Sequence, residues 1–135
     1  MKILINAIQA VHNCGVVHRD LKPENIMLIF KSDVFVDLKL IDFGFAIYED
    51  QIYQNMENLA GTINYMAPEI INGEVFGIQS DVFSLGVILY FILSSELPFY
   101  SEENELVIRK ISQGDFDFNL RVFDYISDDA KDLIC

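Results

Sequence analysis

The 135-residue sequence predicts a single, mainly helical domain that carries a small β-hairpin. Residues 82–93, VFSLGVILYFIL, are apolar on every side. A bilayer-spanning helix needs about 20 residues, so this shorter segment is expected to be a buried central helix. Branched and aromatic side chains are frequent in two segments, residues 26–30 (IMLIF) and 36–42 (VDLKLID). These segments lie on either side of the polar residues 31–33 (KSD). This pattern predicts two strands joined by a turn.

The N-terminal element is predicted to be an amphipathic helix over residues 2–13. Apolar residues recur there at helical spacing, at Leu4, Ile5, Ile8 and Val11. A signal peptide would have an uninterrupted apolar run, but Asn6, Gln9 and His12 interrupt this one. We therefore expect a helix that packs one face on the core.

The second half of the chain is expected to be helical. Pro68 should open a short helix that Gly73 closes, and the buried helix should span residues 80–95, with Asp81 as a possible N-cap. A turn at residues 97–99 leads to a further helix near 104–111. Ser127, followed by two aspartates, indicates the start of a last helix.

Composition limits the classes of function. A net charge of −12 argues against nucleic-acid binding, because phosphate repels an acidic surface. Such a surface suits basic peptides or divalent cations, although solubility alone also explains it. A hydrophobic fraction of 52% suggests that a missing lobe or partner chain covers part of the surface. Cys14 and Cys135 form no metal or disulfide motif, and with no targeting or membrane segment evident, a cytoplasmic or nuclear location is expected.

Three short motifs occur in a fixed order. His18-Arg19-Asp20 is followed by Asn25, then by residues 42–44 (DFG) and 67–69 (APE). In this order and spacing they resemble the large, C-terminal lobe of the eukaryotic protein kinases. The segments LKPEN and YMAPEI are most similar to serine/threonine kinases of the calmodulin-dependent group. The resemblance covers essentially the whole chain.

The resemblance implies a function and a set of catalytic residues. A kinase of this type transfers the γ-phosphoryl group of ATP to a serine or threonine hydroxyl of a protein or peptide substrate, with Mg²⁺ as cofactor. Asp20 would accept or orient the hydroxyl proton, and Lys22 would reach the γ-phosphate. Asn25 and Asp42 would hold Mg²⁺ through oxygen atoms. The nucleotide-binding set implied by the resemblance comprises Lys22, Glu24, Asn25, Met27 and Asp42.

Other positions are given structural roles by the same resemblance. His18 would pack on Phe43 of the DFG motif, beside Gly44. Asp81 would anchor the backbone of the HRD loop. Met27 could form the floor of the adenine pocket, although a methionine in a strand is equally often ordinary core. Residues 45–66 show no periodicity and are expected to be an irregular, functional loop.

That loop is expected to act as the activation loop. Arg19 would bind a negative charge in it, but residues 45–60 contain no serine or threonine. Glu57 could supply the charge permanently, or could simply be a solvated side chain; phosphorylation of Tyr53 is a third route. Thr62 resembles the residue that packs near the catalytic aspartate.

The chain also departs from the family pattern. The glycine-rich loop, the ATP-pairing lysine and the hinge of the small lobe are missing, as is the later arginine that would pair with Glu69. Phe83 replaces the usual tryptophan. Residues 1–135 are therefore expected to be a partial kinase domain, truncated at both ends. The alternative is a catalytically inactive kinase-fold fragment that serves as an interaction module or is a relic of a truncated gene.

Overall fold

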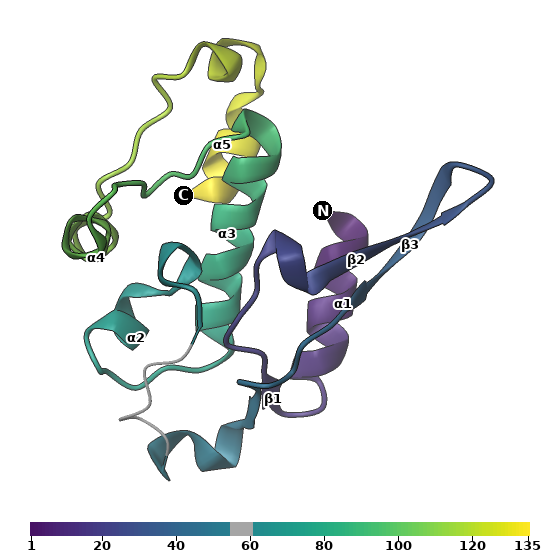
Figure 1. Cartoon of the computed structure of the whole chain (residues 1–135), viewed down its shortest axis with the longest axis vertical. Helices are drawn as coiled ribbons and strands as arrows, with labels where there is room; N and C mark the ends of the chain where they lie inside the picture. Colours follow the sequence, from purple (N-terminus) through teal and green to yellow (C-terminus); the bar gives the residue numbers. More distant parts are fainter. Residues whose placement is uncertain (55–60) are drawn as a thin grey trace.

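The computed structural model describes residues 1–54 and 61–135 (Figure 1). Its helices are α1 (Lys2–His12), α2 (Pro68–Ile71), α3 (Ile78–Ser94), α4 (Asn104–Gln113) and α5 (Asp128–Ile134). Its strands are β1 (Val16–Val17), β2 (Ile26–Lys31), β3 (Val34–Leu40) and β4 (Ile47–Tyr48). Short 3₁₀ helices span Pro23–Asn25, Glu49–Gln54, Ile63–Tyr65 and Arg121–Tyr125. The mainly helical fold with a small hairpin is thus confirmed.

Helix α3 forms the centre of the molecule, as its apolar sequence predicts. It shares one buried cluster with α1 and α4, in which Leu85 and Ile88 of α3 join Leu4 and Ile8 of α1 and Val107 and Ile111 of α4. The helix begins after Gly77, so Asp81 is not its N-cap. Asp81 lies in the first turn of α3, and its carboxylate is bonded to other parts of the chain.

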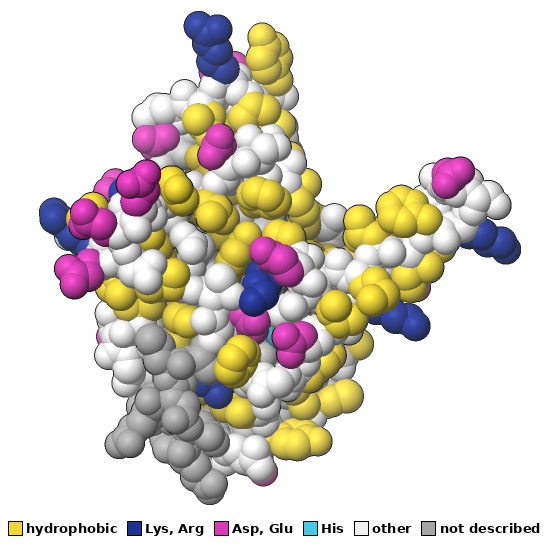
Figure 2. All heavy atoms as spheres, viewed as in Figure 1, with side chains coloured by type: hydrophobic (Ala, Val, Ile, Leu, Met, Phe, Trp, Pro, Cys, Tyr) yellow, Lys and Arg dark blue, Asp and Glu magenta, His cyan; other side chains and the backbone are white. Residues whose placement is uncertain are grey.

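The β2–β3 hairpin extends away from the helices (Figure 1). Its turn is two residues long, shorter than predicted, because Lys31 pairs with Val34. Ser32 and Asp33 both have positive φ, 50° and 61°, which is the conformation of the tight hairpin turns that follow strand twist. The hairpin leaves many apolar side chains exposed, among them Leu28, Phe30 and Val34 (Figure 2).

A second, smaller sheet was not predicted. Strands β1 and β4 pair antiparallel through Val16 with Tyr48 and Val17 with Ile47. The expectation of an irregular segment over residues 45–66 is therefore wrong in part, since this segment contains β4 and two 3₁₀ helices. Two-residue strands are too short to show a period in the sequence. This pairing fixes the start of the HRD loop beside the segment that follows Gly44.

The remaining helix boundaries agree closely with the sequence patterns. Pro68 is the first residue of α2, and Gly73 follows the helix with a φ of 69°. Ser127 caps α5 by accepting a hydrogen bond from the Ala130 backbone N–H. No helix in the described part of the chain has the length and hydrophobicity needed to cross a membrane.

Candidate active site

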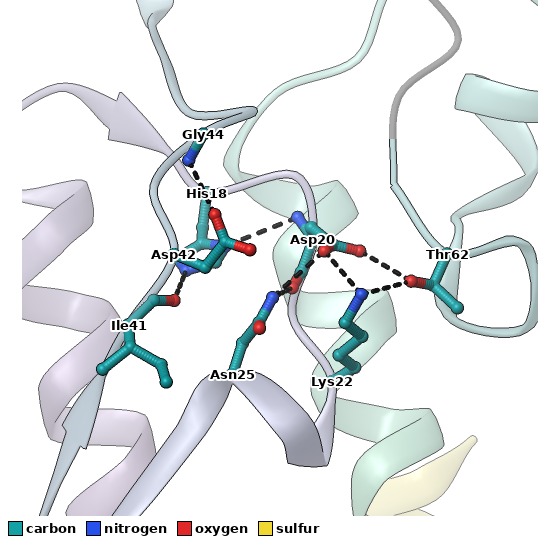
Figure 3. Close-up of polar contacts among 8 residues, drawn as sticks. All are labelled: His18, Asp20, Lys22, Asn25, Ile41, Asp42, Gly44 and Thr62. Atoms are coloured by element: carbon teal, nitrogen blue, oxygen red, sulfur yellow. Dashed lines mark hydrogen bonds and ion pairs between the residues drawn. The ribbon is translucent and has the colours of Figure 1, made fainter.

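The carboxylate of Asp20 is the centre of the polar site (Figure 3). Asp20 lies in the loop between β1 and the Pro23–Asn25 turn, and only 3% of its surface is exposed. Its Oδ1 accepts a hydrogen bond from Thr62 Oγ1 at 2.9 Å. Its Oδ2 accepts from Asn25 Nδ2 at 3.0 Å and lies 2.8 Å from Lys22 Nζ. The side chain is thereby fixed by three neighbours.

These neighbours set the charge of Asp20. Burial raises the pKa of its carboxyl group. The hydrogen bonds from Lys22, Thr62 and Asn25 and the positive charge of Lys22 lower that pKa by more, so that it lies below the ordinary value of an aspartate. Asp20 is therefore ionised at neutral pH and can accept a proton or a hydrogen bond.

Lys22 and Thr62 are coupled to each other as well as to Asp20. Lys22 Nζ donates a hydrogen bond to Thr62 Oγ1 at 2.7 Å, and the Thr62 hydroxyl in turn donates one to Asp20 Oδ1. Thr62 comes from a segment 42 residues further along the chain. The site thus assembles only when the segment after the undescribed residues 55–60 docks on the HRD loop. Glu57, which is expected to supply a negative charge in the activation loop, lies outside the described residues.

A glycine makes this docking possible. Gly61 has a φ of 114°, and a Cβ at this position would lie 2.5 Å from the carbonyl oxygen of Arg19. Any side chain would therefore collide with the backbone of the HRD loop. The sequence indicates no special role for Gly61, because nothing in it reveals the close approach of two distant segments.

Asp42 and Asn25 offer oxygen atoms on the same side of the site (Figure 3). Asp42 has a φ of 61°, and its Oδ1 accepts a hydrogen bond from the Gly44 N–H at 3.2 Å. A Cβ on Gly44 would lie 3.0 Å from that oxygen, so any side chain at this position would crowd the Asp42 carboxylate. The amide nitrogen of Asn25 is engaged by Asp20, which leaves its oxygen as the atom able to bind a cation.

This donor set fits Mg²⁺. Magnesium is usually held by one or two protein oxygen ligands, while phosphate groups and water complete its shell. No group of three or more histidine, cysteine or acidic side chains in residues 1–54 and 61–135 could enclose a metal ion by itself. Asp42 and Asn25 supply one carboxylate and one amide oxygen, which is the number and kind of protein ligands that suits Mg²⁺ bound with phosphate groups.

His18 is a buried residue that contacts both the DFG segment and the HRD loop. The ring of His18 lies 4.7 Å from the ring of Phe43, as the family resemblance implies. Its Nε2 lies 3.3 Å from the Ile41 carbonyl oxygen, and its Nδ1 lies 3.4 Å from the Asp20 backbone nitrogen. In this geometry Nδ1 accepts from the Asp20 N–H, and Nε2 is placed to donate to the Ile41 carbonyl oxygen. His18 thus joins the DFG segment to the HRD loop.

The carboxylate of Asp81 accepts hydrogen bonds from the backbone of the HRD loop. It is completely buried, and its Oδ1 and Oδ2 accept hydrogen bonds from the backbone N–H groups of Arg19 and His18 at 3.0 and 2.9 Å. His12, at the end of α1, also contacts Oδ2, at 2.8 Å. In the sequence, His12 is visible only as a polar interruption of an amphipathic helix. No local signal identifies its contact, because the two residues are 69 positions apart.

The remaining predicted residues lie around this centre. The Arg19 guanidinium is buried 4.8 Å above the ring of Phe76. Glu69 accepts a hydrogen bond from Ser80 Oγ at 2.7 Å, a partner that the sequence analysis does not identify. Glu24 is exposed and takes no part in the Asp20 cluster. Met27 is 51% exposed, so it is not core in this structure.

Comparison with known proteins identifies the same family along the whole chain. Residues 1–135 match the family model described as protein kinase domain. A probable myosin light chain kinase of Dictyostelium discoideum is 43% identical over 135 residues, which cover 99% of this chain and 27% of that protein. Calcium-dependent protein kinase 6 of Arabidopsis thaliana is 41% identical over 135 residues (98% and 24%). The smooth muscle myosin light chain kinase of Gallus gallus is 39% identical over 134 residues (99% and 7%). The chain thus spans only about a quarter of the first two relatives and much less of the third.

Proposed function

Because the chain belongs to the protein kinase family, and to its calmodulin-dependent group of serine/threonine kinases, we propose that it forms the catalytic part of a kinase large lobe. In this function it transfers the γ-phosphoryl group of ATP to a serine or threonine hydroxyl of a protein substrate. We further propose that a small lobe from outside residues 1–135 covers the nucleotide. The short coverage of the relatives supports this division.

The observation that carries the proposal is the ionised, immobilised carboxylate of Asp20. In phosphoryl transfer the protein mainly positions groups and neutralises charge. Asp20 orients the substrate hydroxyl and takes up its proton as the hydroxyl oxygen bonds to phosphorus and ADP departs. The hydrogen bonds from Thr62 and Asn25 hold the carboxylate in one orientation before the substrate arrives.

The cationic and metal-binding groups complete the assignment. Lys22 Nζ, 2.8 Å from Asp20, places a positive charge where the γ-phosphate would lie beside the hydroxyl. Asp42 and Asn25 would hold Mg²⁺, and the ion supplies charge neutralisation for the phosphates when it is bound. Met27, exposed on β2 beside the site, is suited to contact the adenine ring once a small lobe covers it.

The experiment uses the chain joined to the small lobe of a curated relative. ATP-dependent transfer is measured to a basic peptide that carries one serine, and to matched peptides with tyrosine or alanine at that position. We expect transfer to serine only, dependent on Mg²⁺ or Mn²⁺ and stopped by a chelator. Absence of transfer from a folded, ATP-binding hybrid would instead support an inactive interaction module.

Thr62 provides a sharper test of the Asp20 geometry. Thr62→Val keeps the shape of the side chain but removes the hydroxyl between Lys22 and Asp20, so kcat should fall roughly tenfold. Thr62→Ser keeps the hydroxyl and should retain most of the activity. Steady-state kinetics of the two variants check this prediction, and equal activity of the valine and serine variants would contradict it.

A further inference from the structure

We propose that two serines of helix α3, Ser80 and Ser84, are positioning residues that dock residues 62–69 beside Asp20. The effect on phosphoryl transfer rests on the proposed kinase function, but the docking itself can be tested without it. Ser80 and Ser84 lie four positions apart, so their side chains leave the same face of α3. Both residues are buried, with 2% and 6% of their surface exposed.

Each serine hydroxyl donates a hydrogen bond to a different part of the docked segment. Ser80 Oγ donates to Glu69 Oε1 at 2.7 Å, and Ser84 Oγ donates to the Tyr65 carbonyl oxygen, also at 2.7 Å. Ser84 Oγ also lies 3.2 Å from the Ser80 carbonyl oxygen, the contact with the preceding turn that helical serines often make. A hydroxyl has one proton, and the shorter distance assigns it to the bond with Tyr65. Ser84 therefore binds a segment outside its own helix.

The backbone of Tyr65 connects Ser84 to the candidate active site. Tyr65 ends the 3₁₀ turn Ile63–Tyr65, and its N–H donates to the Thr62 carbonyl oxygen at 2.9 Å. The Thr62 hydroxyl in turn donates to Asp20 Oδ1. A buried carbonyl oxygen that loses its donor favours conformations in which water can reach it. Loss of the Ser84 hydroxyl should therefore loosen the turn that places Thr62 against Asp20.

Ser80 holds the other end of the same segment. Glu69 lies in the first turn of α2, which is only four residues long. A helix of this length is not stable by itself, so tertiary contacts must fix its position. The hydrogen bond from Ser80 is one such contact. Residues 62–69 are thus bonded to the HRD loop at their start and to α3 at Tyr65 and Glu69.

Ser94 of the same helix provides a matched control. Its Oγ contacts the carbonyl oxygens of Tyr90, in the preceding turn, and of Glu96, two positions further on. Ser94→Ala therefore removes a hydroxyl from α3 without removing a bond to residues 62–69. Alanine favours a helix more than serine does. The substitutions Ser80→Ala, Ser84→Ala and Ser94→Ala should consequently leave α3 itself intact.

Amide hydrogen exchange of the 135-residue chain tests the contact made by Ser84. In Ser84→Ala, the amides of Tyr65 and Met66 should exchange roughly tenfold faster than in the parent chain. The Ile88 amide in the middle of α3 should keep its rate, and Ser94→Ala should change none of these rates. Unchanged exchange at Tyr65 and Met66 in Ser84→Ala would overturn the proposal. Equal acceleration at Ile88 would also overturn it, because Ser84 would then only stabilise the fold.

Ser80→Ala tests the second contact in the same experiment. The Ile71 N–H donates to the Ala67 carbonyl oxygen within α2. Its exchange should become faster when the hydrogen bond to Glu69 is lost, again with no change at Ile88. The same Ile71 rate in Ser80→Ala and in the parent chain would remove Ser80 from the proposal.

Turnover of the hybrid with a small lobe tests the effect on catalysis. Ser84→Ala should lower kcat roughly threefold to tenfold and leave the KM for ATP unchanged. Because Ser84 acts through Thr62, it should have no further effect in the Thr62→Val background. Unchanged kcat in Ser84→Ala, or the same fold loss in both backgrounds, would show that Ser84 does not position Thr62. If the parent hybrid transfers no phosphate, the proposed function fails, while the exchange experiment still decides the docking.

Discussion

Replacing Asp42 with alanine is expected to reduce phosphoryl transfer by at least roughly 10²-fold in the chain supplied with a small lobe. Asp42 is the only carboxylate of the proposed metal pair, and its partner Asn25 offers a neutral oxygen. Without Asp42 the proposed cation would lose its charged protein ligand, and Lys22 would be left as the cationic group beside the phosphates. The measurement is the initial rate of peptide phosphorylation over a range of Mg²⁺ concentrations.

Asp37→Ala is the matched control for this variant. Asp37 is an exposed aspartate of β3, on the same hairpin that leads into the site, and its Oδ1 only accepts from the next backbone N–H. Its replacement removes the same charge from the molecule and should leave the rate unchanged. If Asp42→Ala and Asp37→Ala were equally active, the assignment of Asp42 as a metal ligand would be wrong.

The 135-residue chain alone is expected to phosphorylate no substrate at a useful rate. Holding the reactants in position can account for about 7–11 kcal/mol of barrier reduction. In the isolated chain, the surface around Asp42 and Met27 is open, since Asp42 is exposed and Met27 is 51% exposed. The test is ATP-dependent transfer to the basic serine peptide. Steady turnover that is lost in Asp20→Asn would contradict the prediction.

The same exposed surface predicts self-association of the isolated chain. The hairpin exposes large apolar side chains (Figure 2). Phe43 of the DFG segment is 46% exposed. By its type and position Ile41 would belong to the same exposed apolar surface, but it is half-buried. Contiguous apolar surface of this kind favours association even at a net charge of −12. Sedimentation velocity should detect oligomers that disappear when the small lobe is joined to the chain.

The elements that the sequence predicts well are those with a local signal. The apolar run of α3, Pro68 at the start of α2 and Ser127 at the start of α5 each act within a few residues. The hairpin follows from two branched, aromatic runs around a polar turn. Local rules fail where distant segments meet. From its local sequence Asp81 looks like an N-cap, and only the family resemblance anticipates its hydrogen bonds to the HRD loop.

In the candidate site, too, the residues that lie close together in the sequence were predictable, and the contacts between distant segments were less so. Asp20, Lys22 and Asn25 are close in sequence, and their grouping can be anticipated from the motif. The contacts made by Thr62, His12 and Ser80 cross 42, 69 and 11 positions, and no periodicity encodes them. They depend on how the helices and loops pack, and of the three only the contact of Thr62 with Asp20 is implied by the family resemblance.

The most direct test of the central claim is Asp20→Asn in the chain joined to a small lobe, with kcat and ATP affinity measured on the same preparation. Asparagine keeps the size of the side chain but cannot take up the substrate proton. The account predicts that kcat falls roughly 10²–10⁴-fold, while the dissociation constant for ATP with Mg²⁺ stays the same. An equal loss of ATP affinity and rate, or an unchanged rate, would contradict the claim that Asp20 acts in the chemical step.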